Sequence, residues 1–236
     1  MAIKLDSSII RKVAMALSGL FLIIFLTQHF IINITSVISE EIFNMLSHFM
    51  GNNFIVQFIA QPILIVGVLF HFIMGFYLEW QNRSARSVKY VVYKGSANST
   101  WISRNMIVSG AVVLSFLVLH FYDFWIPEMK YKYYDFLAED PNRYHEELVH
   151  KFNDPIKVVL YCISFFFLAL HLLHGFASSF KSLGTDSRYY YSIDLFTKIY
   201  AIGIPLGFCF IAVFHLITNI VTCLLYTSDA ADDTLC

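Results

Sequence analysis

The chain has 236 residues, of which 58% are hydrophobic and only 14% are charged, and its formal net charge is −1. So little charge excludes an ordinary soluble domain and indicates a membrane protein with several spans. The near-neutral balance gives no sign of nucleic-acid binding. We therefore look first for segments that cross a bilayer.

Five apolar segments reach the length of about 20 residues that a transmembrane helix needs. They cover residues 12–35, 57–80, 103–125, 154–181 and 196–225. The first follows Arg11 and Lys12 and is too long for the apolar core of a cleaved signal peptide, so we expect it to be a permanent helix. The prediction is an all-α fold, a polytopic membrane bundle of five transmembrane helices that forms one domain over residues 1–225. No internal repeat is evident.

The last residues, 226–236 (YTSDAADDTLC), form an acidic string that follows the fifth segment abruptly. They resemble translated read-through of a sequencing adapter. We predict that this tail is not native, and it carries no part of the functional interpretation.

Basic residues gather on one side of the predicted bundle. They are Lys4, Arg11, Lys12, Arg83, Arg86, Lys89, Lys94, Arg104, Lys181, Arg188 and Lys198. The opposite loops are mainly acidic, so the positive-inside rule places the N-terminus in the cytoplasm and the C-terminus outside. The three tryptophans, Trp80, Trp101 and Trp125, lie at predicted helix ends, where an interfacial aromatic belt would hold them.

Four histidines, His29, His71, His120 and His171, each lie inside a different apolar segment. Counted from the cytoplasmic side at about 1.5 Å per residue, His29 and His120 lie at depths of roughly 25 and 22 Å. His71 and His171 lie at roughly 13 and 15 Å. A histidine in hydrocarbon is costly without a partner, so we predict an outer pair and an inner pair. Each pair could supply the two axial ligands of a haem, and without a CxxCH motif such a haem is of the b type.

Glycines lie one helical turn from two of these histidines. Gly67, His71 and Gly75 are four apart on one face, as are His171 and Gly175. A missing side chain beside a ligand lets a flat macrocycle approach the backbone, so we predict that these glycines pack against haem. The alternative is that small residues simply let two helices pack closely.

The other histidines leave alternatives open. His174 lies one turn after the fourth-segment ligand and is a second candidate for the inner pair. His215 either competes at the outer depth or forms a hydrogen bond across helices as a lone polar residue. His48 is a candidate contact for a quinone or a haem propionate, or a solvated loop residue. His145 and His150, in the long outer loop, are expected to be solvated.

The sequence resembles the cytochrome b subunit of type B succinate dehydrogenases and fumarate reductases. The resemblance spans all five segments and rests on SGLFLIIFLTQHFIIN (18–33), SHFM (47–50), LFHFIMGFY (69–77), FLVLHFYDFW (116–125) and ALHLLHGFASSF (169–180). It implies five helices and two b haems. Carried over by position, His29 and His120 would bind the distal haem, and His71 and His171 the proximal one.

The resemblance also implies partners. The cytoplasmic face, with the basic stretches 83–104 and 181–198, would dock an iron–sulfur subunit that in turn binds an FAD flavoprotein. Succinate or fumarate would react there, so this chain is an electron carrier and membrane anchor in the bacterial cytoplasmic membrane, without catalytic residues of its own. Its electrons would pass to or from a membrane quinone, with menaquinone expected. Candidate quinone contacts near the outer layer are Gln28, Asn33, Glu41 and His48.

Two alternatives compete with this interpretation. A dihaem anchor of a hydrogenase or formate dehydrogenase would share the haem chemistry and differ in its soluble partners. A transporter or assembly protein without haem would belong to a different class. The acidic residues Glu79 and Asp123 lie at predicted helix ends, so no buried carboxylate relay is expected, which argues against ion-coupled transport.

Overall fold

A computed structural model of the chain describes residues 8–84 and 105–229. It contains five helical spans: α1 (Ser8–Ile38); η1 with α3 (Val56–Ala60, Gln61–Ser84); α6 with η2 and α7 (Met106–His120, Phe121–Trp125, Ile126–Tyr133); α9 (Pro155–Ser182); and η3 with α10 (Ser187–Tyr189, Tyr190–Asp229). No strand occurs among the described residues. The predicted all-α, five-span fold is confirmed.

Four of the five observed spans are longer than the apolar segments that predicted them, and α9 has the same length as its segment. The third span continues past Trp125 to Tyr133, and the helix of the fifth begins at Tyr190 rather than at residue 196. Hydropathy marks only the part of a helix that crosses hydrocarbon, whereas backbone hydrogen bonding continues into the polar interface. Of the suspected tail, residues 226–229 continue α10. The rest of the tail, Trp101 and most of the basic stretch 83–104 lie outside the described residues.

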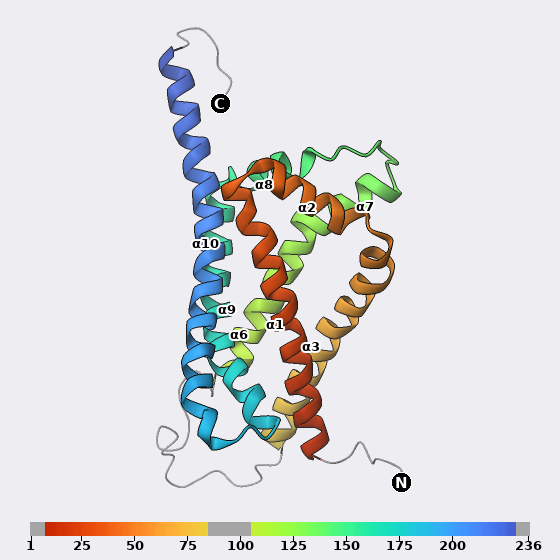
Figure 1. Cartoon of the computed structure of the whole chain (residues 1–236), viewed down its shortest axis with the longest axis vertical. Coiled ribbons are helices and arrows are strands. Elements are labelled where there is room, and N and C mark those ends of the chain that lie inside the picture. Colours follow the sequence, from red (N-terminus) through yellow and green to blue (C-terminus); the bar gives the residue numbers. More distant parts are fainter. Residues whose placement is uncertain (1–7, 85–104, 230–236) are drawn as a thin grey trace.

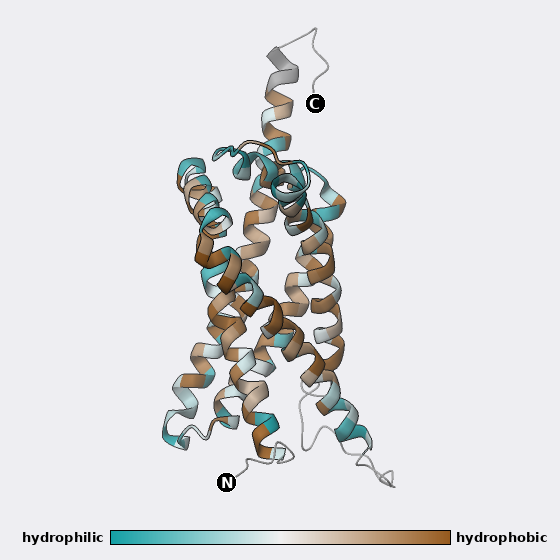
Figure 2. Cartoon of the chain, turned by 90° about the vertical axis from the view of Figure 1, so that its right-hand side faces the viewer, coloured by the Kyte–Doolittle hydropathy of each residue, from teal (hydrophilic) through white to brown (hydrophobic). Residues whose placement is uncertain are grey.

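The start of α1 and the end of α10 lie at opposite ends of the bundle, as an odd number of spans requires (Figure 1). Apolar residues occupy the middle of the helices and polar residues their ends (Figure 2). Large apolar side chains on the outer faces are well exposed, such as Ile24 at 70% and Ile73 at 67%. Contact with lipid, not water, stabilises such a surface, and the chain is a multi-pass membrane protein.

Three short helices cover the predicted outer end, where the sequence was expected to form loops (Figure 1). They are α2 (Glu40–Asn52), α7 and α8 (Arg143–Phe152). The hydroxyl of Ser39 caps α2 by accepting a hydrogen bond from the Ile42 amide at 3.3 Å. Helices α2 and α8 are amphipathic and too short to be found as apolar segments in the sequence. Helix α8 buries Leu148 and Phe152 against the bundle.

The buried core lies in the outer half of the bundle, directly beneath this cap. Helices α1 and α9 are central: α9 packs against α10, α6 and α1, and α1 also contacts α3. The core joins α2, α8, α9 and α10 through Phe43, Leu148, Phe152, Val158, Tyr161, Phe165, Phe208, Ile211 and Ala212. The outer half is therefore held together by apolar and aromatic packing.

Two wide helical turns each precede a proline. The π-helical turns η1 and η2 are followed by Pro62 and Pro127. Proline has no N–H to donate to the carbonyl four residues earlier, so the ordinary hydrogen-bond ladder cannot continue through it. The turn η2 begins directly after His120 and changes the direction in which the next side chains project.

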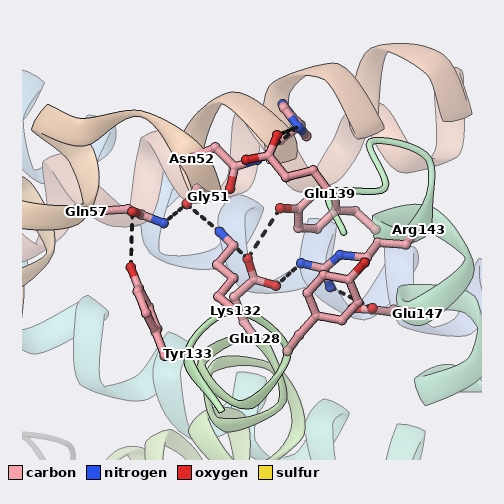
Figure 3. A network of polar contacts seen from close by, with 12 residues as sticks. Gly51, Asn52, Gln57, Glu128, Lys132, Tyr133, Glu139, Arg143 and Glu147 are labelled. Carbon is pink, nitrogen blue, oxygen red and sulfur yellow. Dashed lines mark hydrogen bonds and ion pairs between the residues drawn. The ribbon is translucent and has the colours of Figure 1, made fainter. Parts of the chain in front are cut away.

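A cluster of charged residues joins the three cap helices (Figure 3). The carboxylate of Glu128 in α7 accepts from Lys132 at 2.5 Å and from the guanidinium of Arg143 in α8. Lys132 also donates to the carbonyl of Gly51 in α2 at 2.5 Å, and Arg143 to Glu147 at 2.7 Å. Burial disfavours the charge of Arg143, but the two carboxylates outweigh it and raise the pKa of the guanidinium. The cluster therefore remains ionised.

Replacing Glu128 by Ala should destabilise the protein by about 3 kcal/mol, because Arg143 would remain buried without its main counter-charge. The measurement is the thermal unfolding midpoint in detergent. The matched control is Glu79→Ala, which breaks an exposed i,i+4 pair with Arg83 and should cost under about 1 kcal/mol. Equal losses in the two variants would contradict a structural role for the cluster.

Candidate functional site

The outer pair of predicted histidines lies in contact between two helices. The rings of His29 in α1 and His120 in α6 have centroids 5.7 Å apart and planes inclined by 88°. The two residues are 91 positions apart in sequence, so only the packing of the bundle brings them together. This is the pairing that the depth count predicts.

The inner pair is formed in the same way. His71 in α3 and His171 in α9 have ring centroids 6.3 Å apart and planes inclined by 74°. Among the described residues, the histidine in ring contact with His71 is His171, and no such contact involves the alternative candidate His174. The four predicted residues thus form two pairs that involve four different spans.

Both separations suit an ion held between two imidazoles. With metal–nitrogen bonds of about 2.1 Å and ring centroids roughly 1.1 Å from each nitrogen, the centroids of two opposed imidazoles stand roughly 6.4 Å apart. The observed 5.7 and 6.3 Å lie close to that spacing. Neither pair has a third protein ligand beside it, because no group of three or more His, Cys, Asp or Glu gathers in the described part of the chain.

Aromatic side chains surround the outer pair. Five rings contact it: Phe25 and Phe208 at His29, and Phe116, Phe124 and Tyr161 at His120. The Nδ1 atom of His120 is buried and has no hydrogen-bond partner among the described residues. An unpaired polar atom in such an apolar setting is costly, so this ring is held by packing alone.

Hydroxyl groups and glycines surround the inner pair instead. The Oγ of Ser18 in α1 lies 3.1 Å from Nδ1 of His71, and the Oγ of Ser109 in α6 lies 3.4 Å from Nδ1 of His171. A Cβ at Gly19 would stand 3.5 Å from the ring of His71. The neighbouring α1 and α6 thus present the same Ser-Gly dipeptide to an inner imidazole.

Sequence reasoning missed these serines, although a signal was present. Ser18 precedes His29 by eleven positions, with Gly19 next to it, and Ser109 precedes His120 by the same interval, with Gly110 next to it. Eleven residues make three helical turns with little rotation, so both groups project from one helix face about 16 Å apart. The expectation of no internal repeat overlooked this shared spacing in α1 and α6.

The glycines predicted to pack against haem lie beside side chains of neighbouring helices, and their contact with haem stays a prediction. A Cβ on each would meet a neighbouring side chain: Phe21 at Gly67 (2.6 Å), Met15 at Gly75 (3.5 Å) and Met106 at Gly175 (3.2 Å). These are the helix-packing contacts of the alternative interpretation. The glycines whose open side faces an inner histidine are Gly19 and Gly110, the latter 3.6 Å from the ring of His171.

Asp123 is buried inside the bundle, which corrects the prediction that it lies at a helix end. It is 2% exposed and accepts hydrogen bonds from Lys157 at 2.8 Å and from the Tyr161 hydroxyl at 2.9 Å. The wide turn η2 contains Asp123 and turns it inward, three residues after His120. Position near a helix end was a poor guide, because α7 continues the span beyond it.

The four candidate quinone contacts do not form one site. Glu41 and His48 line an open pocket of about 520 Å³ at the outer end, between α2 and the start of α8. Gln28 instead contacts the sulfur of Met50, and Asn33 donates to the backbone carbonyl of its own helix. His48 is also bound to other groups, with Asn52 at 2.9 Å and Glu139 at 3.5 Å.

Two further histidines form a third contact. His215 is 3% exposed and its Nε2 lies 3.0 Å from the Oγ of Ser36, which matches the alternative of a polar residue bonded across helices. The ring of His145 lies 5.5 Å from that of His215 and contacts the Ser36 carbonyl at 3.2 Å. The expectation that His145 is solvated is therefore wrong, whereas His150 is exposed.

The described part of the predicted docking face is not uniformly basic. Three basic side chains are already paired with a nearby acid: Arg83 with Glu79, Arg188 with Asp186, and Lys198 with Asp194. Arg188 holds the pKa of the Asp186 carboxyl below its usual value through hydrogen bonds. These charges suffice to set topology, and they leave less unpaired positive charge for a partner than the sequence suggested.

No protein family, curated protein or solved structure matches this chain. A functional proposal therefore depends on the geometry of the histidine pairs and on the sequence motifs around them.

The buried Asp123–Lys157 pair should behave as one energetic unit. Asp123→Ala and Lys157→Ala should each cost about 3 kcal/mol, because each leaves a charge in the bundle without its partner. The double variant should lose less than the sum, by about 1–3 kcal/mol of coupling. The check is a double-mutant cycle of unfolding midpoints, and additive losses would contradict the pair. Lys198→Ala, in an exposed pair, is the control.

Proposed function

We propose that this chain is a dihaem cytochrome b that anchors a succinate:quinone oxidoreductase in the bacterial cytoplasmic membrane. The observation that carries the proposal is the meeting of four histidines as two pairs at two depths. Each pair joins two helices, as a haem between two axial imidazoles requires.

The donor set favours haem over a simple metal ion. A zinc or copper site needs three or four protein ligands, whereas each pair here offers two imidazoles. A haem would bring its own nitrogen ligands to the iron and would need only the two imidazoles from the protein. The absence of a CxxCH motif makes the haem non-covalent. The open sides of Gly19 and Gly110 leave the inner imidazoles uncrowded.

The residues of the chain would hold and insulate the two groups. His29 and His120 would bind the outer haem within an aromatic layer, and His71 and His171 the inner one beside Ser18 and Ser109. Haem supplies one-electron redox chemistry when bound. Ser18, beside the inner pair, and His29, in the outer pair, lie about 16 Å apart along α1, so the two groups together would form a path for electrons across the membrane.

The partners are proposed from the sequence resemblance. An iron–sulfur subunit would dock at the end opposite the cap, and a flavoprotein bound to it would oxidise succinate or reduce fumarate. Menaquinone would exchange electrons with the outer haem near the cap. The pocket lined by Glu41 and His48 is the most suitable of the predicted quinone positions, because it is open and lies at that end.

The first test is haem quantitation and a reduced-minus-oxidised optical spectrum of the purified chain. We expect two b haems in the wild type and about one in His71→Ala or His29→Ala, since one imidazole cannot hold a haem tightly in place of two. The matched control is His174→Ala, which removes a histidine of α9 outside the inner pair and should retain both haems. A folded wild type that binds no haem would falsify the proposal.

The anchor role needs a separate test. The chain should co-purify from its native membrane with a flavoprotein that carries FAD and with an iron–sulfur protein, and the preparation should reduce a quinone analogue with succinate. Co-purification with a hydrogenase or formate dehydrogenase would retain the cytochrome and overturn the succinate assignment.

A further inference from the structure

We propose that Ser18 and Ser109 are positioning residues that fix the tautomer of the two inner histidines, so that each presents an unprotonated Nε2 to a metal. The hydrogen-bond geometry is independent of any bound group. The consequence for haem rests on the proposed function.

The direction of the hydrogen bond follows from counting protons on Ser18. Its hydroxyl has one hydrogen, which it donates to the backbone carbonyl of Met15 at 2.8 Å. The same oxygen lies 3.1 Å from Nδ1 of His71. With that hydrogen donated to Met15, the serine oxygen is left to accept, and we assign the proton to Nδ1 of His71 on this basis.

Ser109 repeats the arrangement on the other side of the inner pair. Its hydroxyl donates to the carbonyl of Met106 at 2.9 Å, and its oxygen lies 3.4 Å from Nδ1 of His171. In each case the serine belongs to the neighbouring helix: a serine of α1 contacts the histidine of α3, and a serine of α6 contacts the histidine of α9. Two separate helix pairs thus use the same contact.

A neutral imidazole that carries its proton on Nδ1 has a free lone pair on Nε2. That nitrogen can bind iron without first losing a proton. The serines are 9% and 4% exposed, so water is poorly placed to replace them. A metal-bound histidine that donates its other N–H to an oxygen becomes a more basic ligand and is held in one orientation.

The outer pair has no such partner. Within the described residues no hydrogen bond reaches the ring of His29 or His120, and Nδ1 of His120 is buried without one. The serine–histidine hydrogen bond is therefore specific to the inner pair among the described residues. It distinguishes two sites that each offer two imidazoles.

The first experiment uses the full chain without haem. Histidine labelled with ¹⁵N reports the protonated nitrogen by NMR, with His71→Gln and His171→Gln variants to assign the signals. We expect His71 and His171 to carry the proton on Nδ1. In Ser18→Ala the His71 signal should shift toward the Nε2–H form, whereas His171 should not change. Protonation of Nε2 in the wild type would overturn the inference.

The second experiment uses the haem-loaded chain and measures midpoint potentials. Ser18→Ala and Ser109→Ala should each retain two haems and shift one midpoint upward, because a less basic ligand stabilises oxidised iron less. Ser18→Thr keeps the hydroxyl and should restore the wild-type potential. The matched control is Ser115→Ala in α6, whose exposed hydroxyl bonds only to the Ala111 carbonyl.

The outcomes separate the two proposals. Two haems with potentials that match Ser115→Ala would overturn the positioning role and leave the cytochrome intact. A chain with Nδ1-protonated inner histidines that binds no haem would overturn the proposed function and leave the role of the serine–histidine hydrogen bond in place.

Discussion

The cost of a histidine in hydrocarbon governs this structure. An imidazole in an apolar span needs a partner, and four spans each bring one to the interior at a matched depth. The rings of His29 and His120 contact each other, as do those of His71 and His171. Serine hydroxyls contact the inner pair, whereas Nδ1 of His120 has no hydrogen-bond partner among the described residues. The helices must therefore keep one mutual rotation and register, because a change of one residue in any span would turn its histidine away by about 100°.

The cap stabilises the outer layer and separates it from water. Helices α2, α7 and α8 lie over the buried core, and the ion pairs around Glu128 and Arg143 hold them to one another. Beneath them, Asp123 with Lys157 forms a second charged contact close to His120. A buried charge is tolerated only with a counter-charge and full hydrogen bonding, so both contacts restrict how the outer end can move.

The two histidine layers differ in polarity although their ligands are the same. Aromatic rings pack around the outer pair, and serines and glycines around the inner pair. A redox group in each layer would therefore experience a different ligand basicity and local dielectric, which are two of the means by which a protein sets a potential. The shared Ser-Gly spacing in α1 and α6 produces the inner environment, and the aromatic core beneath the cap produces the outer one.

The sequence by itself determined the five spans and their order, and it predicted which histidines pair, because apolar length and helical rise are local properties. It did not determine which groups surround them. Ser18 is 53 positions from His71 and Asp123 is 34 from Lys157, and such contacts depend on how the helices rotate against one another. The cap helices were also missed, since their apolar faces are short and meaningful only against the bundle. Tertiary packing decided which side chains the glycines contact. Gly67, Gly75 and Gly175 lie against other helices, whereas Gly19 and Gly110 face the inner histidines. The neighbour of a glycine belongs to the opposing helix, so the glycine's own helix does not reveal it.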